Sequence, residues 1–200
     1  METGGGALRK HQRWLILALA MIGLWQLGQG LYIHAKAYLA QALIAHAWTA
    51  SRASGAPVRP WPWADTYPIA RLRAPAHDVD LYVLEGDSGR SLAFGPGHMT
   101  RTALPGTAGN AVISAHRDTH FSFLKSLQAG DELEIESSDA ATPTRRYRTS
   151  SAAVVNQHDT LITLDTRKPT LTLVTCYPFD ALVPGGPLRY VVSAEAIEPN

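Results

Sequence analysis

The sequence predicts an all-β domain, a closed or nearly closed barrel of eight strands, with one transmembrane helix before it. From Tyr67 onward the chain is a series of short runs in which apolar and polar residues alternate, separated by turn residues. Many short strands at this spacing are typical of a β-sandwich or β-barrel. One helix-like stretch among eight strands favours the barrel, and a charge-free apolar run near the N-terminus predicts the membrane helix.

The expected strands cover residues 68–74, 79–86, 91–97, 110–116, 131–138, 145–156, 170–176 and 188–198. Their largely alternating residues predict strands with one buried face and one exposed face. Residues 120–131 break this pattern and are expected to form a helix of a few turns. The barrel should therefore contain one or two short helices.

The N-terminal region begins with residues 1–13, which contain a basic cluster, and continues with the uncharged segment 14–33. A helix of 20 residues spans about 30 Å, the thickness of the hydrocarbon core of a bilayer. The basic cluster favours a cytoplasmic N-terminus, so the rest of the chain is expected on the other side of the membrane. A cleaved signal peptide is an alternative, since "AKA" at residues 35–37 resembles a cleavage site. A buried soluble helix is the third possibility.

Residues 34–64 are expected to connect this segment to the barrel, which would occupy residues 65–200. The alanine-rich first part favours a helix, which either lies at the membrane or packs on the barrel. A stretch rich in Gly, Pro and Trp follows and indicates a boundary. Trp61 and Trp63 in this stretch suit either the lipid interface or a cap on the core.

Composition limits the possible partners and sites. The chain has 200 residues and a net charge of +1, which gives no indication of a nucleic-acid surface or an acidic tail. Its single cysteine, Cys176, excludes an intramolecular disulfide framework and a metal site built from several thiolates. Cys176 is therefore a buried small side chain, an accidental thiol or a nucleophile.

Three reactive side chains lie at expected strand ends. His116 and Cys176 each end a strand, and Arg189 lies near the start of another. A barrel can bring such ends together at one rim. A thiol nucleophile, an imidazole that donates a proton and a fixed positive charge are the groups that covalent acyl transfer requires.

Around these residues the chain resembles the sortases, a family of membrane-anchored cysteine transpeptidases. "TLVTC" matches their T-L-x-T-C signature, "AHR" with "FSFLKSLQAGDELEI" resembles their histidine loop, and "PLRYVV" resembles their arginine segment. The resemblance covers about residues 67–197 and implies the eight-stranded β-barrel of the family. It also implies that Cys176 is the nucleophile, His116 the general acid/base and Arg189 the contact to the oxyanion or the substrate backbone.

The resemblance implies a function as well. Sortases cleave a C-terminal sorting signal similar to Leu-Pro-x-Thr-Gly on an exported protein and pass the acyl group to an amine acceptor. The expected partners are therefore such a substrate protein, an amine acceptor that the sequence does not identify, and the membrane; no cofactor and no nucleic acid are expected. The chain looks most like the dedicated sortases of Gram-negative bacteria, which implies a single-pass inner-membrane protein with a periplasmic barrel.

Five further residues are weaker candidates for substrate binding. Thr175, in the signature, has a hydroxyl that suits a substrate backbone contact. Leu161, Ile162 and Leu164 precede the cysteine strand and suit either an apolar pocket for the signal or the core. His120 is expected at the rim of the active site.

No metal site is predicted. His116 and His120 are four residues apart, a spacing that two metal ligands on a helix can have, but no thiolate or HExxH pattern accompanies them. Glu132, Glu134 and Glu136 alternate along one expected strand. Some sortases bind calcium through acidic residues, but a solvated strand face is the expected role of these three.

Two other functions are compatible with parts of the sequence. L,D-transpeptidases also combine a β-rich fold with Cys and His. The sequence around their nucleophile resembles S-x-G-C-x-R, however, whereas this chain has "LVTCYP" around Cys176. A membrane-tethered barrel without turnover that only holds signal peptides is the alternative from another class.

Overall fold

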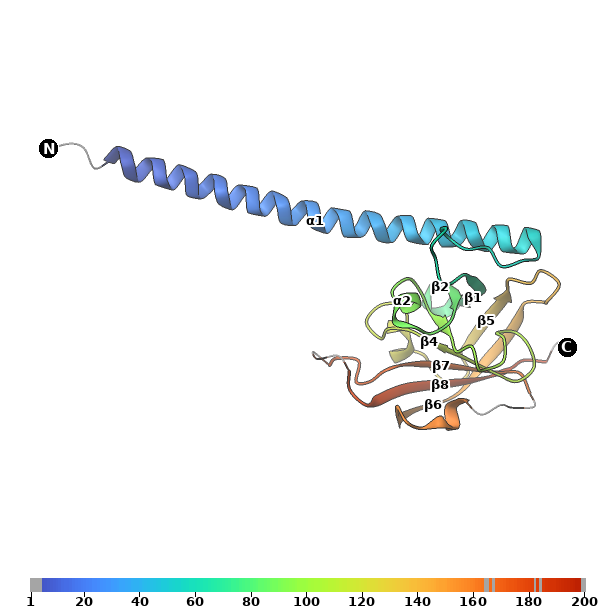
Figure 1. Ribbon diagram of the computed structural model, residues 1–200. Coiled ribbons are helices and arrows are strands. Elements are labelled where there is room, and N and C mark those ends of the chain that lie inside the picture. The colour runs from blue at the N-terminus through green and yellow to red at the C-terminus, as the bar shows by residue number, and fades with distance from the viewer. Residues whose placement is uncertain (1–4, 164–165, 167, 182, 184, 199–200) are drawn as a thin grey trace. The chain divides into compact units, whose positions relative to one another are not determined.

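The computed structural model describes residues 5–163, 166, 168–181, 183 and 185–198. Eight strands close into one barrel in the order β1-β2-β3-β4-β7-β8-β6-β5 (Figure 1). The expected eight-stranded barrel is confirmed. The chain divides into two compact units, Met1–Gln41 and Ala42–Asn200, and the second contains the whole barrel.

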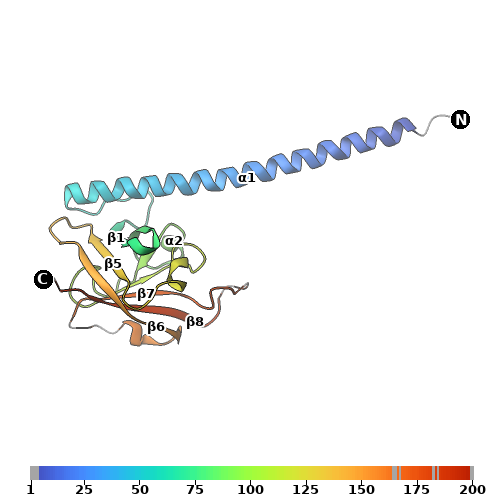
Figure 2. The same cartoon turned by 180° about the vertical axis from the view of Figure 1, so that it is seen from behind.

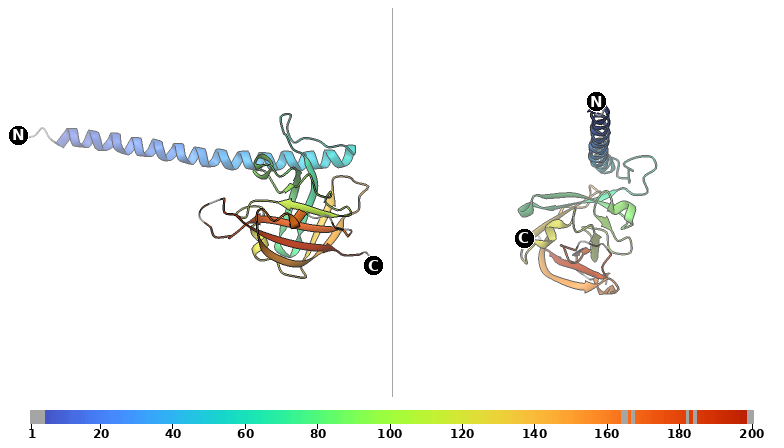
Figure 3. Two further views of the ribbon diagram at one scale, coloured as in Figure 1. Left: turned by 60° about the horizontal axis from the view of Figure 1, so that its bottom comes forward. Right: turned by 90° about the vertical axis from the view of Figure 1, so that its left-hand side faces the viewer.

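The strands are short, as the alternating runs predicted. They are β1 (Pro68–Ala74), β2 (Val79–Glu85), β3 (Gly97–His98), β4 (Asn110–Ser114), β5 (Glu132–Ser137), β6 (Arg145–Asn156), β7 (Thr170–Cys176) and β8 (Leu188–Ala196). Three single 3-10 turns, η1 (Pro75–His77), η2 (Ser122–Lys125) and η3 (Thr160–Thr163), lie between strands. The views from behind and from the side show β6, β7 and β8 next to one another in the barrel wall (Figures 2 and 3).

Alternation along the strands builds the barrel core. In β7, Leu171 and Leu173 are fully buried and belong to the main apolar cluster. Its other members from the barrel wall include Leu72, Val83, Ile113, Leu133, Ile135, Tyr147 and Val192. Because successive side chains of a strand point to opposite faces, Thr170, Thr172, Val174 and Cys176 lie on the outer face of the wall.

The prediction of a strand at residues 91–97 is largely wrong. The short helix α2 (Gly89–Leu92) occupies its start, and only Gly97–His98 form a strand, β3. Ser88 caps α2, because its side chain accepts a hydrogen bond from the backbone N–H of Ser91 at 3.4 Å. This cap stabilises a helical turn where the apolar pattern alone indicated a strand.

The expected helix at residues 120–131 is reduced to the single turn η2. Phe121 and Phe123 are both buried, and so are Leu124 and Leu127. Residues two apart lie about 200° from each other around an α-helix, so a regular helix would expose one of the two phenylalanines. The 3-10 turn lets both rings enter the core, where they meet edge to face at 5.9 Å.

One long helix, α1 (Gly5–Ser54), includes the predicted membrane segment 14–33 and the first part, 34–54, of the segment expected to connect it to the barrel. Among the described residues it is the helix that is long and apolar enough to cross a membrane. A membrane anchor and an N-terminal signal sequence both meet this criterion. Membrane anchoring therefore stays a prediction.

The C-terminal turns of α1 belong to the barrel unit. Ile44, Ala47, Trp48 and Ser51 are buried, at spacings of three and four residues that define one face of a helix. The ring centroids of Trp48 and of Tyr82 on β2 lie 5.8 Å apart. Of the two roles that the sequence left open for this segment, packing on the barrel applies to these residues. A fragment that begins at Arg52 would lose this packed face.

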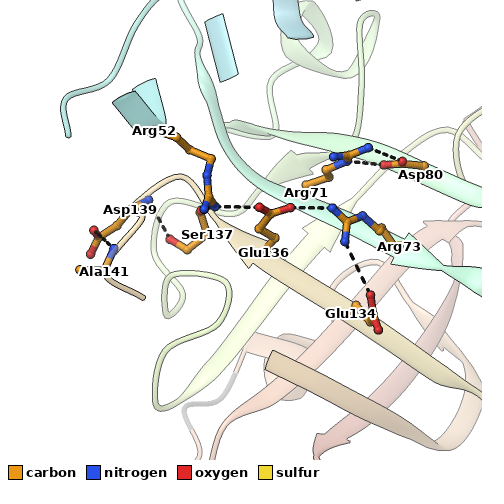
Figure 4. Close-up of polar contacts among 9 residues, drawn as sticks. All are labelled: Arg52, Arg71, Arg73, Asp80, Glu134, Glu136, Ser137, Asp139 and Ala141. Carbon is orange, nitrogen blue, oxygen red and sulfur yellow. Dashed lines mark hydrogen bonds and ion pairs between the residues drawn. The ribbon is translucent and has the colours of Figure 1, made fainter. Parts of the chain in front are cut away.

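A chain of charged side chains accompanies the packed face (Figure 4). Arg52 at the end of α1 pairs with Glu136 on β5 at 2.9 Å and donates a hydrogen bond to the carbonyl oxygen of Ser137 at 2.7 Å. Glu136 also pairs with Arg73 on β1 at 2.7 Å, and Arg73 reaches Glu134 at 3.8 Å.

The third glutamate of β5, Glu132, pairs with Arg148 at 3.0 Å and with Arg146 at 3.5 Å. All three acidic residues of this strand are thus partnered by arginines on the outer surface of the barrel. Among the described residues, no group of three or more His, Cys, Asp and Glu side chains is arranged to hold a metal ion.

We expect Trp48→Ala to lower the free energy of unfolding by about 3–5 kcal/mol, because the substitution leaves a cavity between α1 and β2. The side chain of Trp63 provides a matched control, since it is 83% exposed whereas Trp48 is 5% exposed. Trp63→Ala should change the stability by no more than about 0.5 kcal/mol. Urea unfolding of the full chain, followed by far-UV circular dichroism, measures both. Equal small effects would show that this end of α1 does not depend on its packing against the barrel.

Candidate active site

Three neighbouring strands place the reactive residues in one row. Strand β4 pairs with β7 in parallel, with Ser114 opposite Val174, and the ladder continues through a hydrogen bond from the N–H of Ala115 to the carbonyl oxygen of Val174 at 3.2 Å. Following this register brings His116 level with Cys176. On the other side of β7, the antiparallel strand β8 places Arg189 directly opposite Cys176.

Cys176 and Arg189 lie on the outer face of the barrel wall. Cys176 has the same parity along β7 as Val174, and Arg189 the same parity along β8 as Val191; both valines belong to a second apolar cluster with Val112. His116 follows the end of β4 by two residues. The strand register thus places the three residues, which the sequence predicted from separate motifs, at neighbouring strand ends.

The three side chains are accessible. His116 is exposed, while Cys176 and Arg189 are partly exposed, and the cysteine is a free thiol. A thiol on an open strand end suits a nucleophile better than the buried role that a lone cysteine often has.

The guanidinium of Arg189 is held by the chain around it. It donates hydrogen bonds to the carbonyl oxygens of Gly186 at 2.7 Å and Leu188 at 2.9 Å. It also donates to the side-chain oxygen of Gln157, just after β6, at 2.8 Å. Gln157 was not predicted, because only the pairing of β6 with β8 brings it to this end of the barrel.

His120 lies beside His116. The N–H of Phe121 donates to the carbonyl oxygen of His116 at 3.0 Å, which closes the turn that carries both histidines. Burial lowers the pKa of His120 below its usual value, and the nearby charge of His116 lowers it further. His120 thus lies in the same turn as His116, and its expected place at the rim of the active site stays a prediction.

Thr175 points away from this face. Its side chain is 2% exposed, and its hydroxyl donates a hydrogen bond to the carbonyl oxygen of Ala115 at 2.7 Å. The parity of Thr175 along β7 is that of the core residues Leu171 and Leu173. This argues against the substrate contact expected for Thr175, and the hydroxyl instead joins the cysteine strand to the histidine strand.

The segment before β7 covers part of the same outer face. Ile162 in η3 packs against the second apolar cluster, and the amide of Asn110 donates to its carbonyl oxygen at 3.0 Å. The side chain of Leu161 and the whole of Leu164 lie outside the described residues.

A cavity of about 320 Å³ opens on this outer face, over the starts of β4 and β7. Its lining includes Asn110, Val155, Ile162, Thr172, Val191 and Ser193. Ile162, which was expected either in an apolar pocket for the signal or in the core, is part of this lining together with several polar residues. Its role in binding the signal stays a prediction.

Arg117 was not singled out from the sequence. Its guanidinium crosses to the loop after Cys176 and donates hydrogen bonds to the carbonyl oxygens of Pro178 at 2.8 Å and Ala181 at 2.6 Å. An arginine next to a reactive histidine indicates a substrate contact as readily as a contact to the loop, so only the structure identifies these acceptors.

Comparisons with known proteins agree with the fold of this domain. The family model described as the sortase domain matches residues 72–197. Sortase D of Bacillus subtilis is 33% identical over 127 residues, which are 63% of this chain and 62% of that protein. The match thus spans less than two thirds of the length of that relative.

Among solved structures, a Clostridium perfringens Sortase D5 transpeptidase aligns with a TM-score of 0.58 and 29% identity, over 66% of this chain and 80% of that one. Sortase A from Corynebacterium diphtheriae aligns with a TM-score of 0.60 and 28% identity, over 69% of this chain and 64% of that one. These relatives give no support to the expected resemblance to Gram-negative sortases. From the matched domain and the shared fold, the chain belongs to the sortase family.

Proposed function

We propose that this chain is a cysteine transpeptidase that cleaves a C-terminal sorting signal similar to Leu-Pro-x-Thr-Gly on an exported protein and transfers the protein to an amine. The observation that carries the proposal is that His116, Cys176 and Arg189 lie at neighbouring ends of β4, β7 and β8, each at least partly exposed. Membership of the sortase family supports the same chemistry.

In this mechanism the thiolate of Cys176 attacks the carbonyl carbon of the signal's Thr and forms a carbon–sulfur bond. The imidazolium of His116 gives its proton to the departing Gly nitrogen as the carbon–nitrogen bond breaks. An acceptor amine then attacks the thioester and loses its proton to His116, and the thiolate of Cys176 leaves. Each proton and bond is balanced over the two steps.

Arg189 supplies the positive charge for the oxyanion. Its three hydrogen bonds to the chain fix the guanidinium before substrate arrives, and the donors that these bonds leave unused can point at the substrate. A charge that is held in place costs no reorganisation as the tetrahedral intermediate forms.

The outer face also accommodates the rest of the signal. The cavity near Thr172 lies four residues along β7 from Cys176, about 13 Å at the rise of a strand. An extended peptide covers roughly 10 Å from Leu to Thr in Leu-Pro-x-Thr. With its Thr carbonyl at the thiol, the signal can therefore place Leu at this cavity, against Ile162 and Val191.

His120 lies in the same turn as His116, and its lowered pKa favours the neutral form of its imidazole.

We further propose that α1 anchors the chain and that the barrel lies outside the cytoplasm. The apolar character of α1 and the basic cluster before it support this arrangement. The Gram-negative subgroup and its periplasmic location are not part of the proposal, since the relatives named above do not support them.

The first test is Cys176→Ala in the full chain in detergent, mixed with peptides that span variants of Leu-Pro-x-Thr-Gly. Intact-protein mass spectrometry should show a mass gain on the wild-type chain together with release of the Gly-side fragment, and neither with the variant. Because Cys176 is the only cysteine in the chain, a thioester adduct must be on this residue. Peptide binding without any adduct would instead favour the barrel that only holds signals.

Arg189→Lys should reduce turnover by roughly 10²–10³-fold, the loss seen when one oxyanion donor is removed. A lysine keeps the positive charge but lacks the planar guanidinium, whose several N–H donors can bond the loop and the substrate at the same time. Arg148→Lys is the matched control, because Arg148 is exposed on β6 and pairs with Glu132 on the outer surface of the barrel. Steady-state rates with a cleaved peptide measure both, and near-normal turnover of Arg189→Lys would remove the proposed role.

His120→Gln should flatten the pH dependence of stability below about pH 6.5, the usual pKa of histidine. The folded pKa of His120 is below its value in the unfolded chain, so the unfolded state binds the proton first and stability falls as the pH drops through this range. Urea unfolding at pH 7.5 and 5.5 measures the difference. His158→Gln is the control, since His158 is exposed. An unchanged difference in His120→Gln would contradict the assignment.

A further inference from the structure

We propose that Arg117 is a positioning residue that clamps the loop after the nucleophile and so sets the geometry between His116 and Cys176. The inference rests on the proposed function, since it concerns the residues proposed for that reaction. It starts from the two hydrogen bonds that the guanidinium donates across the site, to the carbonyl oxygens of Pro178 at 2.8 Å and Ala181 at 2.6 Å.

The two acceptors belong to one turn. The N–H of Ala181 donates a hydrogen bond to the carbonyl oxygen of Pro178 at 3.4 Å, which closes the turn. The carbonyl oxygens of Pro178 and Ala181 accept hydrogen bonds from different terminal nitrogens of Arg117. Two bonds from a planar guanidinium fix the orientation of the turn as well as its distance. A lysine carries a single ammonium on a flexible stem and cannot impose both.

The clamped turn is also held from the inside. Phe179, between the two acceptors, packs against the main core cluster and meets Tyr190 edge to face at 5.2 Å. The rings of Tyr177 and Tyr190 stack with their centroids 6.2 Å apart. The backbone N–H of Tyr177 donates to the carbonyl oxygen of Leu188 at 3.0 Å. The described part of this loop, which follows Cys176 directly, is therefore held to the core and to the start of β8.

The far end of the same loop supports the guanidinium of Arg189. Its carbonyl oxygens at Gly186 and Leu188 accept hydrogen bonds from that residue. Because the N–H of Tyr177 bonds the carbonyl oxygen of Leu188, a displacement of Tyr177 would disturb the chain beside both the nucleophile and the proposed oxyanion donor.

Both chain neighbours of His116 are tied to the cysteine side. Ala115 accepts the hydrogen bond from Thr175, and Arg117 donates to the turn beyond Cys176. The separation between the imidazole of His116 and the thiol of Cys176 is thus set by two contacts. One is the hydrogen bond of Thr175 to Ala115, and the other is the contact of Arg117 with the loop after Cys176. Misplacing reacting groups by about 1 Å can cost 10²-fold in rate, so loss of the clamp should impair acylation.

The experiment compares Arg117→Met and Arg117→Lys in the full chain in detergent. Arg71→Met is the matched control, because Arg71 also donates two hydrogen bonds, to Asp80 on β2 in the outer surface of the barrel (Figure 4). The measurements are the single-turnover acylation rate with the signal peptide, KM, the thermal midpoint, and hydrogen exchange of the amides at Tyr177 and Ala181 without peptide.

We expect both Arg117 variants to lose about 10- to 100-fold in acylation rate. KM should change less than the rate, the two loop amides should exchange faster, and the thermal midpoint should stay within a few degrees of the wild-type value. Arg71→Met should leave the acylation rate and the exchange of the two loop amides unchanged. A lysine that fails to restore the rate shows that the fork, and not the charge alone, is required.

Wild-type acylation in Arg117→Met, or full activity in Arg117→Lys, would overturn the clamp. An equal loss in Arg71→Met would do the same, because the effect would then be a general loss of stability. If the Met variant does not fold, the Lys variant decides. If the wild-type chain forms no acyl-enzyme with any peptide, the proposed function fails, and unchanged exchange of the loop amides in the variants would then refute the clamp on its own.

Discussion

The pairing of β7 with a parallel strand on one side and an antiparallel strand on the other is the constraint on which the site depends. The parallel partner β4 and the antiparallel partner β8 run from opposite ends of the barrel wall. The end of β4 and the start of β8 therefore meet at the end of β7, beside Cys176. His116 and Cys176 are separated by the whole of β5 and β6 in the chain, yet the register makes them neighbours.

The two faces of these strands have different tasks. One face supplies Leu171, Leu173 and Val192 to the core, and the other carries Val174, Cys176 and Arg189. Parity along the strand decides which task a residue has, because a strand turns successive side chains to opposite sides. Thr175 shows the consequence, since its place next to the nucleophile puts its hydroxyl among buried residues and not on the outer face.

Apolar burial outweighs the ion pairs where α1 meets the barrel. Arg52 and Glu136 are each partly exposed, and such pairs contribute roughly 0–1 kcal/mol. Burying side chains such as Ile44 and Trp48 contributes about 1.5–3 kcal/mol each. The packed face therefore supplies most of the stability, and the chain of charges from Arg52 to Glu134 favours one orientation of the helix end on β5.

The sequence by itself predicted the barrel, most of its strands and the candidate residues His116, Cys176 and Arg189, because strand alternation and the motifs around these residues are local patterns. It did not determine β3 or the turn at Ser122–Lys125, where a serine cap and the burial of Phe121 and Phe123 outweigh the local pattern. Only the tertiary structure decided the contacts of Gln157, Thr175 and Arg117. Their partners lie far away in the chain, and the register of the closed barrel brings them within reach.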